Sequence, residues 1–134
     1  MGDQSTRFAG YAALFNIPDA DRDTIRQGAF SETLEARGPP LPLLWHHRPD
    51  QVIGTVESIA EDKRGLRVVA RLDRHNSRAA TMLKRGAVSG LSFGYRARKA
   101  HHSDQGRELT AIDLFEVSLV THPLQHGARV HLIA

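Results

Sequence analysis

Apolar and polar residues alternate along several short stretches of the chain, and an alternation of period two is typical of half-buried β-strands. Glycine, proline, asparagine and aspartate lie between these stretches, so each one is predicted to end in a turn or loop. The predicted strands are 8–15, 41–45, 51–59, 66–72, 89–98, 108–120 and 128–133. The pattern therefore predicts about seven strands, two of them joined as a hairpin by the polar turn 61–65.

Two short segments favour helix instead. Ser31 is placed to cap a helix over 32–36, and Asn76 or Ser77 to cap a second helix that ends at Gly86. Because strands dominate and connections are short, the predicted class is mainly β (α+β): an antiparallel or mixed β-barrel with short peripheral helices. A flat α+β sandwich is the alternative. The chain contains no repeat and no linker, so a single domain over 1–134 is expected.

Composition excludes some classes of function. The 134 residues are 40% hydrophobic and 25% charged, which is ordinary for a globular protein. The absence of cysteine excludes disulfides and thiolate chemistry, and no apolar run is long enough to span a bilayer. The net charge is +3, but the arginines are dispersed among acidic residues. This dispersal favours a mixed, solvated surface over a nucleic-acid-binding patch.

Ser92 lies in a stretch with an unusual choice of small residues. Alternation puts Gly90 and Gly94 on the same face as Ser92, and Leu91 and Phe93 on the other. Glycine weakens a strand and packs nothing, so we expect another group to approach the backbone closely here. Ser92 is therefore a candidate nucleophile, and the two glycines are predicted to leave room for a substrate strand.

A serine nucleophile needs a base, and the chain offers eight histidines. His46 and His47 stand where an apolar segment runs into a proline-containing loop, a common place for functional side chains. On an extended chain adjacent residues point in opposite directions, so at most one of the pair faces Ser92. The alternative is that both are solvated. His101 and His102 lie in a predicted polar loop, 100–106, and have a weaker claim.

Glu116 is a candidate for the group that orients the base. Its neighbours along the strand are apolar, and a carboxylate is costly to bury unless it is paired. An arginine partner and a catalytic role are both open at this point, and Asp113 is a weaker candidate. No metal or cofactor is expected, because the chain lacks cysteine and a His-Glu-x-x-His motif.

Taken in order, these motifs resemble the prohead (procapsid) maturation proteases of tailed bacteriophages, a family related to the herpesvirus assemblins. The resemblance runs from about residue 8 to residue 130. Its elements are 10–16, 28–30, 43–47, 53–54, 65–66, 90–95 and 116–123. The resemblance implies an assemblin-like β-barrel.

The resemblance also implies site residues and a reaction. The tryptophan-x-histidine segment of such proteases carries the base, which corresponds to His47, and their glycine-x-serine-x-glycine segment carries the nucleophile, Ser92. Glu116 corresponds to the third residue, with His122 as the alternative. Assemblins use a histidine as the third residue and an arginine pair near the oxyanion site. The stretch 121–128 has no arginine, so backbone N–H groups of that loop are the expected substitute.

By the same resemblance, the chain is expected to be a serine endopeptidase that cleaves the scaffold segment of the major capsid protein and itself. It would act inside the assembling prohead, in the bacterial host cytoplasm, with no membrane or specific nucleic-acid partner. A homodimer is left open. The alternatives are a non-catalytic β-barrel scaffold or nucleic-acid-binding module, and a hydrolase of small esters using the same three residues.

Overall fold

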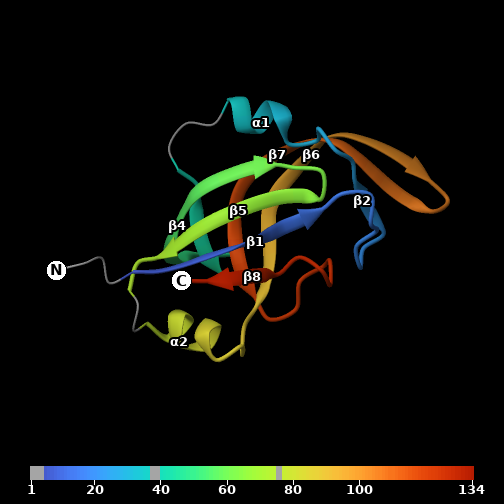
Figure 1. Ribbon diagram of the computed structural model, residues 1–134. Coiled ribbons are helices and arrows are strands. Elements are labelled where there is room, and N and C mark those ends of the chain that lie inside the picture. The colour runs from blue at the N-terminus through green and yellow to red at the C-terminus, as the bar shows by residue number, and fades with distance from the viewer. Residues whose placement is uncertain (1–4, 37–39, 75–76) are drawn as a thin grey trace.

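A curved, eight-stranded mixed sheet forms most of the molecule (Figure 1). The computed structural model describes residues 5–36, 40–74 and 77–134. The strands are β1 (Thr6–Leu14), β2 (Asp23–Ile25), β3 (Pro42–Trp45), β4 (Arg48–Glu61), β5 (Gly65–Leu72), β6 (Gly90–Ser103), β7 (Gly106–Val120) and β8 (Val130–Ile133). The helices are α1 (Ser31–Glu35) and α2 (Arg78–Lys84). The predicted mainly β, barrel-like class is confirmed.

The strand order explains why the barrel stays open. The sheet runs β2-β7-β3-β4-β5-β1-β8, and β6 pairs with β7 off this path. Both β2 and β3 run parallel to β7, whereas the other pairs are antiparallel. Only the first residues of β6 reach the far end of the sheet, where Leu91 N donates to Ala128 O at 2.8 Å. Beyond these residues, and within the described part of the chain, β6 does not pair with β8 or β1, so the barrel is open on this side.

The core lies inside the curved sheet. Apolar residues from alternate positions of the strands fill it, as the period-two pattern predicts. Leu91 belongs to this core, and Phe93 packs against it, so the face predicted for each is correct. The largest fully buried side chains are Phe8, Phe30, Leu43, Leu66, Leu72, Leu83, Leu91, Leu109, Ile112 and Leu119.

The main differences from the sequence predictions concern β2, the end of β6 and the start of β4. Strand β2 was not predicted, because it has three residues and pairs only with a distant segment of β7. The predicted loop 100–106 is wrong: β6 continues to Ser103 and joins β7 by a tight turn. Strand β4 already starts at Arg48, so a two-residue turn replaces the loop expected after His47.

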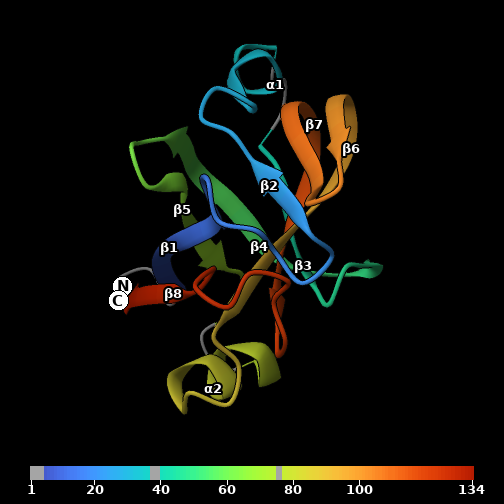
Figure 2. The same cartoon turned by 90° about the vertical axis from the view of Figure 1, so that its right-hand side faces the viewer.

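The two helices lie at opposite ends of the sheet (Figures 1 and 2). The prediction that Ser31 caps α1 is wrong: Phe30 is the N-cap, and its own side chain makes no capping hydrogen bond. In α2 the Ser77 side chain accepts the N–H of Ala80 at 3.2 Å, which confirms that cap. The other candidate, Asn76, lies outside the described residues.

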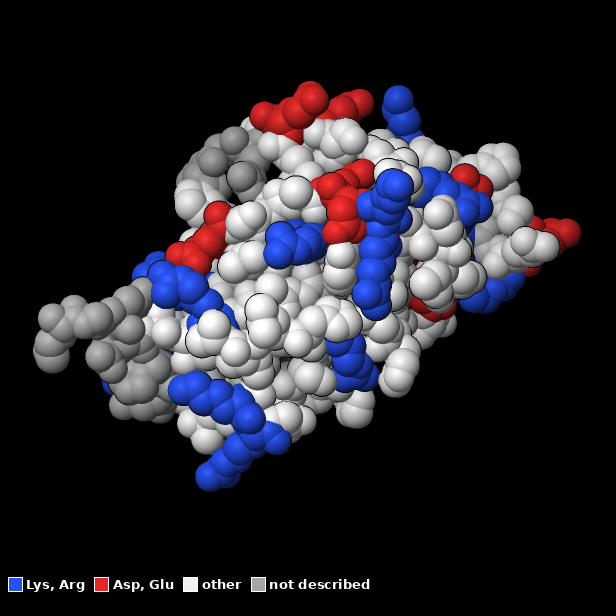
Figure 3. All heavy atoms as spheres, in the orientation of Figure 1, with Lys and Arg blue, Asp and Glu red and all other residues white. Residues whose placement is uncertain are grey.

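The surface in Figure 3 shows lysine and arginine side chains spread over the face, with acidic side chains close to several of them. Surface ion pairs such as Arg7–Glu57 and Arg98–Glu32 also bring opposite charges together. The face therefore matches the dispersed charge of the sequence. Among the described residues, no helix has the length and apolar character needed to cross a membrane.

Candidate active site

Ser92 lies near the start of β6, directly opposite Ser118 of β7. Ser92 is 9% exposed, so most of the residue is buried. The prediction that another group approaches this stretch closely is correct, but the expected occupant was wrong. A Cβ at Gly94 would collide with the carboxylate of Glu116, and one at Gly90 would lie 2.6 Å from the ring of Pro123. The glycines thus make room for the protein's own side chains.

His47 is presented by a two-residue hairpin turn between β3 and β4. Trp45 pairs with Arg48, and the two histidines between them have φ values of 51° and 61°. Positive φ at both central positions is the pattern of a type I′ turn, which normally favours asparagine and glycine. For other residues this conformation costs about 1–2 kcal/mol each. Such strain, once observed, is typical of functional positions.

Hydrogen bonds from β7 and the following loop hold this turn in place. His46 N donates to Leu119 O at 3.0 Å, and His47 N donates to Ser118 Oγ at 3.0 Å. The ring of His46 lies edge-on to Trp45, and its Nε2 accepts the N–H of Thr121 at 3.2 Å. The backbone is a turn and not extended, and His47 is the member of the pair that hydrogen-bonds to Ser92.

Three side chains form a continuous chain of hydrogen bonds. His47 Nε2 lies 3.0 Å from Ser92 Oγ, and His47 Nδ1 contacts Glu116 Oε1. With the proton on Nδ1, the ring donates to the carboxylate and offers the Nε2 lone pair to the serine hydroxyl. This is the order of partners that a nucleophile, a base and an orienting acid require.

Ser118 completes the arrangement, and sequence reasoning missed it. Its hydroxyl donates to Glu116 Oε2 at 2.7 Å while accepting the N–H of His47, so it links the carboxylate to the turn. Ser118 is fully buried. Its position two residues after Glu116 could have identified it in the sequence, because residues two apart lie on the same face of a strand.

The electrostatics of the two adjacent histidines differ. Hydrogen bonding to Glu116 raises the pKa of His47 above its ordinary value of about 6.5, against the opposing effect of burial. Burial lowers the pKa of His46, helped by the positive charge of Arg48. This direction favours the neutral ring, in which Nε2 can accept the N–H of Thr121.

The structure separates the other candidates from Ser92. Asp113 pairs with Arg96 and Arg98. The carboxylate of Glu116 bonds instead to His47 and Ser118, so the alternative of an arginine partner for Glu116 is wrong. His101 and His102 lie exposed on the distal part of β6. Among the described residues, no group of three or more His, Cys, Asp or Glu is arranged to hold a metal ion.

A groove opens beside the hydroxyl of Ser92. Its lining residues are His46, His47, Ser92, Val120, Thr121, His122 and Leu124. The alternative third residue, His122, therefore lies in this groove, whereas the acceptor beside His47 Nδ1 is the carboxylate of Glu116. The buried Gln125 fixes the groove-lining loop by bonding to the N–H and the carbonyl of Leu14, at 2.7 and 2.9 Å.

The curved sheet and the linked serine, histidine and glutamate together define a site of the serine-hydrolase type. A family model described as caudovirus prohead serine protease matches residues 1–134. The chain belongs to this family, as the sequence motifs indicated.

Two curated relatives extend the comparison. The chain is 32% identical to the prohead protease of Enterobacteria phage HK97 over 130 residues, which cover 92% of this chain and 58% of that protein. It is 30% identical over 103 residues to the capsid polyprotein of Pseudomonas phage PAJU2, covering 68% of this chain and 15% of that protein. The chain thus spans little more than half of the first relative and a small part of the second.

Solved structures show the fold of the chain. The varicella-zoster virus protease matches with a TM-score of 0.64 at 19% identity, over 95% of this chain and 63% of that one. A KSHV protease in complex with a hexapeptide phosphonate inhibitor matches with a TM-score of 0.66 at 15% identity, over 98% and 65%. The assemblin-like fold expected from the sequence is confirmed.

Proposed function

We propose that this chain is a serine endopeptidase of capsid maturation, with Ser92 as nucleophile, His47 as general base and Glu116 as the residue that orients the base. One observation carries the proposal: His47 joins the Ser92 hydroxyl, at 3.0 Å, to a carboxylate that is almost fully buried. Family membership supports the same reaction class.

In the proposed reaction, neutral His47 removes the proton from Ser92 Oγ as this oxygen attacks a peptide carbonyl. Glu116 holds the proton on Nδ1 and stabilises the imidazolium that forms. His47 then gives the proton to the leaving amine. In the second step His47 removes a proton from water as the water attacks the acyl-enzyme, and it returns this proton to Ser92 Oγ as the acyl group leaves. Base catalysis of this kind contributes on the order of 10²–10⁴-fold.

The oxyanion donors are proposed to be backbone N–H groups of the loop 121–128. Two of these groups are already used: Thr121 N donates to His46, and Ala128 N donates to Gln125 O at 3.0 Å. Pro123 has no N–H. The candidate oxyanion donors are therefore the N–H groups of the remaining residues of this loop. Of these residues, His122 and Leu124 line the groove beside Ser92.

The proposed substrates are the scaffold segment of the major capsid protein and the protease itself, cleaved within the assembling prohead in the host cytoplasm. The name of the HK97 relative, a prohead protease, supports this setting, and so does the similarity to part of a capsid polyprotein. A homodimer and a single domain over 1–134 are further parts of the proposal.

Co-expression with the capsid protein tests the proposal. Ser92→Ala should abolish cleavage of the scaffold segment, because no other group is proposed to attack the carbonyl. Ser58→Ala is the matched control, since Ser58 is exposed on β4, away from the groove. The readout is the mass of the capsid protein after co-expression.

Continued cleavage by Ser92→Ala at the normal rate would overturn the assignment. Turnover of small esters without turnover of a peptide would favour the ester hydrolase. Strongly salt-dependent DNA binding without any turnover would favour the nucleic-acid-binding module.

A further inference from the structure

The buried face of β7 changes phase along the strand. Ile112 and Leu114 point into the core, and so do Val117 and Leu119. Residues two apart share a face of a regular strand, so a strand with Leu114 in the core would also turn Glu116 into the core. An irregularity between residues 114 and 117 is therefore required to bring Glu116 to the side on which His47 lies.

A β-bulge at Phe115 provides this irregularity. Gly94 of β6 pairs with Glu116, but the next residue, Tyr95, pairs with Leu114, so Phe115 has no partner on β6. Its side chain is 55% exposed. Bulges of this kind re-aim neighbouring side chains and are frequent beside active sites. The direction of the Glu116 carboxylate thus depends on the backbone conformation around this bulge.

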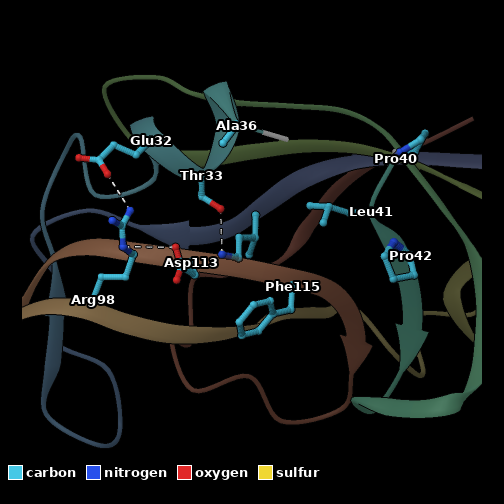
Figure 4. Close-up of a pocket in the computed structure, with 10 residues that line it drawn as sticks. Glu32, Thr33, Ala36, Pro40, Leu41, Pro42, Arg98, Asp113 and Phe115 are labelled. Carbon is cyan, nitrogen blue, oxygen red and sulfur yellow. Dashed lines mark hydrogen bonds and ion pairs between the residues drawn. The ribbon is translucent and has the colours of Figure 1, made fainter. Parts of the chain in front are cut away.

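Thr33 of α1 holds the residue that precedes the bulge. On the edge of β7 away from β6, β2 pairs with residues 107–109 and β3 with residues 117–119, which leaves a gap between them. The N–H of Leu114 faces this gap and donates to Thr33 Oγ1 at 3.1 Å. Figure 4 shows Thr33 reaching from α1 to β7. On this edge of β7, the residue before the bulge is therefore held by a side chain and not by a neighbouring strand.

Helix α1 is itself anchored, so Thr33 is a firm support. The carboxylate of Glu61 accepts the N–H groups of Gly28 and Phe30 at 2.8 and 2.9 Å, just before the helix. The ring of Phe30 is fully buried and lies edge-on to Phe93, the neighbour of Ser92, with 5.5 Å between ring centroids. These contacts connect the segment at the start of α1 to β4 and to β6, the strand that carries Ser92.

We propose that Thr33 is a positioning residue of this site, which fixes the bulge at Phe115 and through it the direction in which Glu116 meets His47. This inference rests on the proposed function for its effect on catalysis. Its effect on the contact between Glu116 and His47 does not depend on turnover. Thr33 touches neither substrate nor the reacting atoms.

The test is an NMR titration of the His47 ring, assigned by the signal that His47→Gln removes. Thr33→Val replaces the hydroxyl with a methyl group of similar size and leaves the N–H of Leu114 without an acceptor. Because contact with Glu116 raises the pKa of His47, this variant should lower that pKa. It should also reduce kcat/KM on the order of 10-fold. Thr33→Ser keeps the hydroxyl and should retain both values.

Thr110→Val is the matched control, because Thr110 is the unpaired residue of another bulge in β7 and its hydroxyl bonds to Lys99 O at 3.5 Å. The His47 pKa should not change in this variant. If Thr33→Val does not fold, as judged by thermal denaturation, Thr33→Ala removes the same hydroxyl and should shift the pKa in the same direction.

Several results would overturn the inference: an unchanged His47 pKa in the hydroxyl-free variants, an equal shift in Thr33→Ser, or an equal shift in Thr110→Val. The proposed function fails separately. If Ser92→Ala cleaves normally while Thr33→Val still lowers the His47 pKa, the positioning role holds and the proposed nucleophile does not.

Discussion

The chain contains two pairs of adjacent histidines, and their surroundings differ at every level. His46 and His47 form a tight turn with positive φ, and His47 bonds to the buried Glu116. His101 and His102 lie on an extended, exposed part of β6, where His101 pairs across the hairpin with Glu108. Each pair thus has a glutamate nearby on β7. Burial and backbone geometry, not residue type, separate the proposed base from a surface histidine.

Removing the carboxylate beside each pair should give the largest contrast. Glu116→Gln keeps the shape of the side chain, but it no longer holds the Nδ1 proton of His47 as a charged acceptor. We expect kcat/KM to fall on the order of 10²–10⁴-fold. Glu108→Gln, whose carboxylate pairs with Arg26 at 2.9 Å on the surface, should leave kcat/KM unchanged.

The Glu116→Gln variant should also change the pH dependence of activity. Because Glu116 raises the pKa of His47, activity should increase with pH as this raised pKa is passed and the ring becomes neutral. In Glu116→Gln the remaining activity should begin its rise at lower pH. A pH profile of kcat/KM measures this. An acid limb that does not move in Glu116→Gln would separate His47 from the titration that controls activity.

The serines near the two pairs should give a smaller contrast. Ser118→Ala removes the hydroxyl that joins Glu116 to the turn, and we expect a loss of activity of about 10-fold. Ser103→Ala removes a hydroxyl that accepts the N–H of Gln105 beside the distal pair, and it should have no effect. Steady-state kinetics measure both, with thermal denaturation as a check on folding. Equal losses in the two variants would contradict a specific role for Ser118.

Most of the strands could be predicted from the local alternation of apolar and polar residues. The strands were recognisable because alternation continues over many residues, and Leu91 and Phe93 were assigned to the correct face. Strand β2 was not, because three residues carry too little pattern and its pairing with β7 is parallel and distant in sequence. Residues 100–103 are polar, which is typical of a loop, but backbone pairing with β7 continues through them.

For the site, Ser92 stood out by its glycine neighbours and Glu116 by its apolar flanks, whereas the choice of His47 over His46 came from family resemblance. The turn that presents His47 was not predictable, because two histidines do not resemble the usual residues of a type I′ turn. Nor was the bulge at Phe115, which depends on tertiary packing. The catalytic roles of the three residues remain predictions.

The most direct test of the central claim is covalent labelling of the serine with a peptidyl phosphonate, followed by intact mass spectrometry. We predict one adduct on Ser92 in the protein and in His101→Gln, and a labelling rate lower by on the order of 10²–10⁴-fold in His47→Gln. Equal labelling of His47→Gln and His101→Gln, or an adduct on another residue, would contradict the account.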